Sequence, residues 1–282
     1  MNAVLANPWP DTGRPAVPQR YQGVWVRNLL EAPGLRDDTS FVRWLQTGVW
    51  HADLRIPREA SADNVASAAT ALRSPLAETD PHRPLALAGQ QGFGGVTDVR
   101  LQDGKEVCTW HRRTDFQPPP SGPDAGWMVF DTLDRVIETG VHAPYLEVWK
   151  RLPGSSGRCI VLARLNDLGD DTHERVLVAG RYLMWVRPRG MAWPKDLPTG
   201  QSLAEVIAKH PALAGELLDH EISFGTLDAG HWTIEQSTLP GRKGCRLACS
   251  LHRELPLHAR MGGDMAGQRW RVLEWNCVES NI

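Results

Sequence analysis

The stretch Trp44-Leu45-Gln46-Thr47-Gly48-Val49-Trp50-His51-Ala52-Asp53-Leu54-Arg55-Ile56-Pro57 decides how the rest of the chain is interpreted. It reads as two β-strands joined at Thr47-Gly48. Because successive side chains of a strand point to opposite faces, His51, Asp53 and Arg55 share one face. The other face is wholly apolar and carries Trp50, Ala52, Leu54 and Ile56. The polar face either meets water, as in an ordinary antiparallel sheet, or lines the cavity of a small closed barrel. The functional hypothesis below depends on the second alternative.

Composition narrows the class of protein. The 282 residues are 41% hydrophobic and 23% charged, as in an ordinary globular protein of one large or two modest domains. A formal net charge of -2 gives no basic field for nucleic acid, and no apolar run approaches the roughly 18–20 residues that span a bilayer. Residues 1–18 lack the features of a secretory signal, and the five scattered cysteines include no CxxC pair. We therefore expect a cytoplasmic protein with no nucleic-acid or membrane partner.

The 26 Gly and 21 Pro are spread along the chain between short apolar segments. This pattern favours an all-β sandwich or barrel. Each half runs three strands, a helical insertion and then four or more strands. We predict a loose N-terminal arm (1–20), a first β-barrel (21–152) with a helical insertion near 58–92, and a second β-barrel (158–282) with a helical insertion near 200–219. The Pro- and Gly-containing segment 153–157 is the predicted linker.

Strand and helix ranges follow from the same signals. In the first half we expect strands at 21–27, 41–46, 49–56, 94–101, 105–115, 128–131, 135–139 and 144–151, with 29–39 as a connection. In the second half we expect them at 158–166, 174–179, 182–187, 220–225, 231–236, 245–253 and 269–276. Helices are predicted at 61–74, 84–91, 202–210 and 211–218.

Four stretches carry a likeness to a known family: FVRWLQTGVWHAD (41–53), IETGVHAPYLEVW (137–149), VLARLN to ERVLVAGRYLMWV (161–186) and RVLEW (271–275). In these the chain resembles the Hri family, fungal and bacterial proteins built of two lipocalin-like β-barrels. The resemblance implies two tandem calycin-type antiparallel barrels, in agreement with the duplicated strand plan. It implies no catalytic residues.

The candidate site combines the polar face of the opening stretch with residues from neighbouring predicted strands. A carboxylate in an apolar, Trp-lined pocket can have a raised pKa and act as a general base or acid, so the catalytic candidates are Asp53, Glu147, His51 and Tyr145. Arginine can hold a substrate carboxylate through two hydrogen bonds. The substrate-binding candidates are therefore Arg55 and Arg112, with Trp110, Trp149, Trp50 and Glu138. The alternative is a buried ion-pair lattice with a purely structural role, because buried charges must pair in either case.

Other groups of polar residues give weaker evidence for a functional site. Glu138 and His142 are too far apart in sequence to share one strand face, although they could meet at a barrel mouth. His51, His111 and His142 lack the spacing of a metal site, and we predict neither a metal nor a cofactor. The second barrel offers Arg164, Trp185, Glu221, Trp232, Glu235 and Glu274. We expect it to be packed solid and to support the first barrel or a homodimer contact.

Three functions stay open on this basis. The first is small-molecule binding in an apolar, Trp-lined cavity of the first barrel. The second is a cofactor-independent lyase, isomerase or hydrolase that uses the cavity carboxylates as general acid and base. The third is an interaction scaffold in which both barrels are filled. Cavity volume separates the third from the others, since a drug-sized ligand needs roughly 300 Å³ or more.

Overall fold

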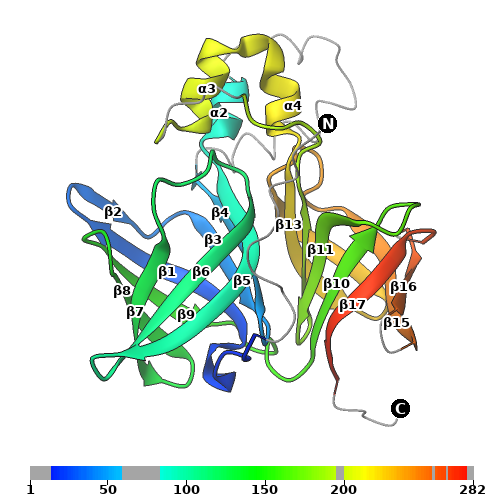
Figure 1. Cartoon of the computed structure of the whole chain (residues 1–282), viewed down its shortest axis with the longest axis horizontal. Helices are drawn as coiled ribbons and strands as arrows, with labels where there is room; N and C mark the ends of the chain where they lie inside the picture. The colour runs from blue at the N-terminus through cyan, green and yellow to red at the C-terminus, as the bar shows by residue number, and fades with distance from the viewer. Residues whose placement is uncertain (1–13, 59–82, 195–199, 256–257, 265, 278–282) are drawn as a thin grey trace.

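The computed structural model describes residues 14–58, 83–194, 200–255, 258–264 and 266–277. They form two closed, eight-stranded antiparallel β-barrels in tandem, side by side under a small helical cap (Figure 1). The predicted fold class is confirmed. The chain passes from one barrel to the other at 152–158, which includes the predicted linker.

The first barrel is closed by pairing of its first and last strands, β1 and β9. Neighbouring strands are hydrogen-bonded in sequence order apart from β2, which pairs with the end of β1 alone. The strands are β1 (Gly23–Ala32), β2 (Leu35–Asp37), β3 (Phe41–Gln46), β4 (Trp50–Ile56), β5 (Gln91–Gln102), β6 (Lys105–Asp115), β7 (Asp124–Thr132), β8 (Arg135–Gly140) and β9 (Leu146–Arg151). The expected connection at 29–39 is wrong, because β1 continues to Ala32 and turns back through a tight hairpin at Gly34.

The second barrel closes through β10 and β17. Its strands are β10 (Cys159–Leu165), β11 (Asp171–Ala179), β12 (Tyr182–Arg187), β13 (Glu221–Asp228), β14 (His231–Ser237), β15 (Arg246–Leu255), β16 (His258–Gly263) and β17 (Arg269–Asn276). The sequence prediction missed β16. Its HARMGG sequence has few β-branched or aromatic residues, so it carries little strand signal.

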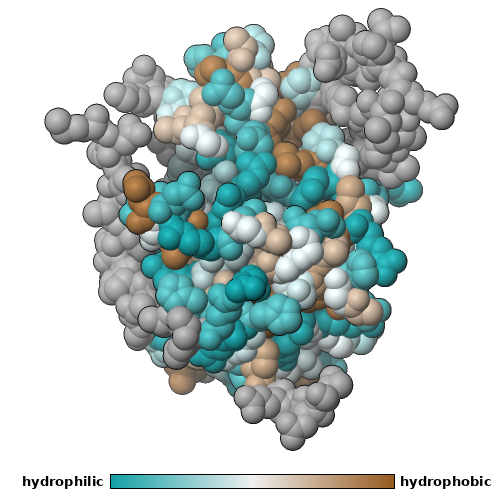
Figure 2. Space-filling view, turned by 90° about the vertical axis from the view of Figure 1, so that its right-hand side faces the viewer, coloured by the Kyte–Doolittle hydropathy of each residue, from teal (hydrophilic) through white to brown (hydrophobic). Residues whose placement is uncertain are grey.

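The apolar face of β4 packs against the second barrel. Trp50, Leu54 and Ile56 belong to one buried cluster with Met184 and Phe224 of the second barrel. This contact explains why β4 is apolar on one face although that face is the outside of a barrel. By contrast, the outer face of the second barrel in Figure 2 is mostly hydrophilic, with small scattered apolar groups.

The helical cap lies over one end of the two barrels (Figure 1). It comprises α2 (Arg83–Ala88), α3 (Leu203–Lys209), η3 (Pro211–Leu213) and α4 (Ala214–Leu218). Ser202 and Glu205 form a capping box that begins α3, as the Ser-x-x-Glu spacing indicates. Gln117 ties the cap to the first barrel, because its side chain donates to the Ala88 carbonyl and accepts from the Leu203 amide. The predicted helix at 61–74 lies outside the described residues.

The end of the first barrel away from the cap is filled by the described part of the N-terminal segment. Val17 is buried and donates its amide to the Gly48 carbonyl at 2.7 Å. Tyr21, in the short turn η1 (Gln19–Tyr21), is fully buried and packs edge-on against Phe130 at 4.8 Å. Of residues 14–20, Val17 alone is buried, in the core cluster of the first barrel, and it attaches this part of the predicted loose arm to the barrel.

Candidate functional site

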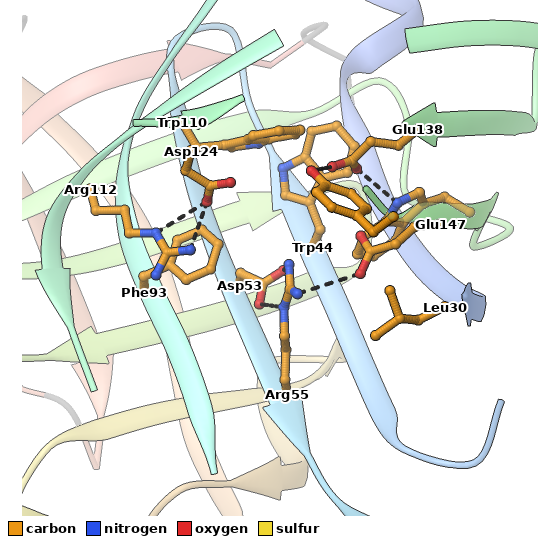
Figure 3. A pocket seen from close by; sticks show the side chains of 12 residues that line it. Leu30, Trp44, Asp53, Arg55, Phe93, Trp110, Arg112, Asp124, Glu138 and Glu147 are labelled. Carbon is orange, nitrogen blue, oxygen red and sulfur yellow. Dashed lines mark hydrogen bonds and ion pairs between the residues drawn. The ribbon is translucent and has the colours of Figure 1, made fainter. Parts of the chain in front are cut away.

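The polar face of β4 points into the first barrel. A cavity of about 200 Å³ lies at the end of this barrel from which the cap-side loops leave. Its walls combine carboxyl, guanidinium and aromatic side chains around an open centre (Figure 3). They are Leu30, Trp44, Asp53, Arg55, Phe93, Trp110, Arg112, Asp124, Glu138, Tyr145, Glu147 and Trp149.

Arg55 joins two of the cavity carboxylates. Its Nε donates to Asp53 at 2.7 Å, and its Nη1 lies 3.5 Å from Glu147. Glu147 also accepts from Arg27 at 2.8 Å, and Arg27 donates in turn to Asp37. Asp53, Glu147 and Arg27 are nearly inaccessible to solvent, so their charges are compensated within this chain of contacts.

Arg112 forms the second ion-pair group on the opposite wall. Its Nε and Nη2 donate to Asp124 at 3.1 and 2.7 Å, and its Nη1 donates to Asp115 at 2.7 Å. The guanidinium also stacks on Phe93, 3.7 Å from the ring centroid. Arg55 and Arg112 are thus both engaged by carboxylates, and neither matches the predicted role of a free clamp for a substrate anion.

Glu138 differs from the other cavity carboxyls. One of its oxygens accepts from the Tyr145 hydroxyl at 2.7 Å and the other from the Trp149 indole N–H at 3.0 Å. Among the described residues it has no ion pair with a cation. Burial, together with the nearby charge of Glu147, raises the pKa of Glu138 to about 8. The group with the properties of a neutral-pH acid or base is therefore Glu138, which the sequence analysis placed among the binding residues.

Aromatic side chains form the apolar part of the wall. Trp44 meets Trp110 edge to face at 5.5 Å and Trp149 at 5.8 Å between ring centroids. The Trp44 indole donates to Gln46 at 3.2 Å, which fixes the ring within the barrel. Edge-to-face packing of this kind holds the three indoles as one rigid wall.

Eight of the ten predicted site residues line the cavity, and two do not. Trp50 faces outward into the contact between the barrels, since it is on the opposite face of β4 from Asp53. His51 points inward but is fully buried away from the cavity, where its Nδ1 lies 3.0 Å from the Thr97 hydroxyl. Burial lowers the pKa of His51 well below its ordinary value, so the ring is neutral at pH 7. Trp50 as a cavity wall and His51 as a group that meets a cavity ligand are both wrong.

The suggested meeting of Glu138 and His142 also does not occur, because Glu138 is buried and His142 is exposed in the loop after β8. Glu274, expected inside the second barrel, instead contacts the first. Its carboxylate accepts from the Thr47 hydroxyl and from the backbone amides of Gly48, Val49 and Trp50 at 2.8–3.1 Å.

Four cavity residues were missed: Leu30, Trp44, Phe93 and Asp124. Trp44 and Phe93 are the cross-strand partners of Asp53. Correct pairing of the predicted strands would have found Trp44, whereas Phe93 lies just before the strand predicted at 94–101. Leu30 and Asp124 lie in parts of β1 and β7 that the sequence prediction left as loop.

The described residues also bear on metal binding and membrane insertion. They contain no group of three or more His, Cys, Asp or Glu placed to hold a metal ion. None of their helices combines the length and the apolar character needed to cross a membrane.

Comparison with known proteins supports the fold alone. No protein-family model and no curated protein matches the sequence. Among solved structures, the chain is similar to the uncharacterized protein YLR301w from Saccharomyces cerevisiae, with a TM-score of 0.52 and 15% sequence identity. The similarity covers 90% of this chain and 99% of that chain, so it includes both barrels.

Proposed function

We propose that the first barrel binds a small organic cation, such as an amine or a quaternary ammonium compound. The observation that carries this proposal is the charge of the buried network. Among the described residues that line the cavity, two guanidinium groups (Arg55 and Arg112) face four carboxyl groups (Asp53, Asp124, Glu138 and Glu147), and of these four only Glu138 has no ion pair. A positively charged guest would balance this excess.

The aromatic wall supports the same class of ligand. The faces and edges of Trp44, Trp110, Trp149 and Tyr145 surround the space beside Glu138. Aromatic rings attract cations through their negative faces, and desolvation strengthens that attraction. The volume of about 200 Å³ is below the 300–1,000 Å³ typical of drug-sized ligands, which favours a compact guest.

Three probes of similar size and different charge test the proposal: benzylamine, benzyl alcohol and benzoate. We expect benzylamine to bind most tightly and benzoate most weakly in calorimetric titrations, with quenching of tryptophan fluorescence as a second measurement. Arg36→Gln, which changes an exposed residue of β2, is the matched control. Tighter binding of benzoate than of benzylamine, or no binding of any probe, would contradict the proposal.

The pH dependence of affinity provides a second test. A cation binds more strongly to the carboxylate form of Glu138, whose pKa is raised to about 8. The affinity for benzyltrimethylammonium, which keeps its charge, should therefore rise from pH 6 to pH 8. Glu138→Gln should remove this rise. A rise that persists in Glu138→Gln would show that another group is responsible.

An enzyme is the second candidate, and Glu138 with Tyr145 favours it. A carboxyl with a pKa near neutrality, hydrogen-bonded to a phenol at 2.7 Å, can accept and return a proton. Loss of turnover of a cavity ligand in Glu138→Gln, with binding retained, would support a lyase or isomerase.

We also propose that the chain belongs to the Hri family. The tandem barrels that this family implies support the proposal.

A further inference from the structure

A second hollow lies at the junction of the two barrels, at the end covered by the cap. Its volume is about 290 Å³. Its walls come from the end of β6, the following loop, the segment after β12 and the residue before β13. They are Arg112, Arg113, Thr114, Asp115, Pro119, Pro120, Pro188, Arg189, Trp193 and His220. We call it the junction hollow.

The junction hollow is cationic. Three arginines line it against one carboxylate, Asp115, among the described residues. Asp115 is already engaged, since it accepts from Arg112 at 2.7 Å and from the Gln117 amide at 2.9 Å. Arg112 is therefore compensated, whereas Arg189 has no ion pair among the described residues.

Arg189 and His220 have donors without partners in this region. Arg189 stacks on Trp193 at 3.9 Å from the ring centroid and donates one Nη2 hydrogen bond to the Phe116 carbonyl. Its Nε and Nη1 are buried with no hydrogen-bond partner among the described residues, and so is Nδ1 of His220. His220 is 1% exposed. Buried polar groups without partners are costly, and charged ones are especially so.

The protonation states fit an anion as the missing partner. Burial lowers the pKa of Arg189 to about 10, which leaves the guanidinium charged at neutral pH. Burial, together with the charges of Arg189 and Arg187, lowers the pKa of His220 to about 3, so its ring is neutral. A neutral imidazole still offers one N–H donor, and the Thr114 hydroxyl lies 3.5 Å from its other side.

We propose that the junction hollow binds a phosphate-type oxyanion through Arg189 and His220. A tetrahedral oxyanion offers acceptors in several directions, which matches donors that come from different strands and loops. A planar carboxylate would satisfy fewer of them. This site is separate from the cavity of the first barrel and does not depend on the function proposed for it, although Arg112 contributes to both.

Calorimetric titration of the full chain with inorganic phosphate at constant ionic strength tests the proposal. We expect saturable binding of one phosphate per chain and no saturable binding of acetate. Arg189→Gln should weaken the phosphate affinity by about tenfold or more. Arg36→Gln removes an exposed arginine outside the hollow and should bind phosphate as the wild type does. Phenyl phosphate separates the two sources of this chemistry, since tighter binding than inorganic phosphate indicates an esterified ligand and weaker binding a free one.

A measurement on the wild type covers the case in which Arg189→Gln does not fold. The ring resonances of His220, identified by their loss in His220→Gln, should shift on addition of phosphate and stay unchanged with acetate. Absence of saturable phosphate binding, equal binding of acetate, or full phosphate affinity in folded Arg189→Gln would each overturn the proposal.

Discussion

The two barrels share a buried glutamate–tryptophan pair, and its surroundings differ. In the first barrel Glu138 accepts from the indole of Trp149, and in the second Glu174 accepts from the indole of Trp185 at 2.8 Å. In both pairs the tryptophan follows the glutamate by eleven residues, across a hairpin. The second oxygen of Glu174 accepts from Arg164, whereas the second oxygen of Glu138 accepts from the uncharged Tyr145.

This difference shows how one fold supports two kinds of interior. In the second barrel the charge of Glu174 is compensated, and apolar side chains that include Trp232, Trp270 and Met261 form a buried core. In the first barrel the uncompensated carboxyl borders a cavity. The partner of the second carboxyl oxygen, a cation for Glu174 and a phenol for Glu138, therefore separates a compensated carboxylate from a carboxyl that borders a cavity.

The largest expected effect compares a tryptophan of each interior. Trp270→Ala should lower the free energy of unfolding by about 3–5 kcal/mol, because it leaves a void in a packed core. Trp110→Ala should cost about 1–3 kcal/mol, since Trp110 already borders empty space. Urea denaturation of both variants measures the difference. Equal losses would show that the two interiors are packed alike.

A change at Glu138 should have the next largest effect, and it depends on pH. The pKa of Glu138 is raised to about 8 in the folded state by burial, so the wild type loses stability as pH rises from its unfolded pKa toward 8. Glu138→Gln keeps the shape and does not titrate. At about 1.4 kcal/mol per pKa unit, we expect the variant to match the wild type near pH 4 and to exceed it by about 4 kcal/mol at pH 8.

Glu174→Gln is the matched control for this change. It removes a carboxylate that Arg164 compensates, so it should lower the stability at pH 7. Thermal unfolding of both variants across the pH range provides the measurement. If the curves of Glu138→Gln and the wild type run parallel from pH 4 to pH 8, Glu138 does not carry a raised pKa.

The alternation in the opening stretch, together with the duplicated strand plan, predicted a barrel with Asp53 and Arg55 in its cavity. Strict alternation in β4 placed Asp53 and Arg55 on one face, and a closed barrel is the structure in which that face becomes an interior. The same alternation places Trp50 on the outer, apolar face of β4. This face is buried against the second barrel and so does not meet water. Only the presence of a second barrel, inferred from the duplicated plan, could have assigned Trp50 correctly.

Contacts between distant strands could not be predicted in the same way. The pairing of Arg27 with Glu147 joins residues 120 apart, and that of Arg112 with Asp124 crosses a loop without periodicity. Whether an arginine is free to bind a ligand anion depends on these partners, which strand periodicity does not specify. The carboxylates that engage Arg55 and Arg112 were not predicted for this reason, and Glu138, the cavity carboxyl without an ion pair among the described residues, was recognisable only in the structure.

The smallest expected effect concerns the contact of Glu274 with the β3–β4 turn of the opposite barrel. Its carboxylate accepts from three consecutive backbone amides, and a Cβ at Gly48 would come within 2.8 Å of it. Glu274→Gln replaces one acceptor oxygen by a donor and leaves an amide of the turn without a partner, so we expect a loss of about 1–2 kcal/mol. Glu254→Gln, at an exposed ion pair, is the control and should cost less than about 0.5 kcal/mol.

Because the apolar contact between the barrels remains in Glu274→Gln, calorimetry should still show a single unfolding transition, at a lower temperature. Two separate transitions in Glu274→Gln would show instead that this one carboxylate makes the barrels unfold together.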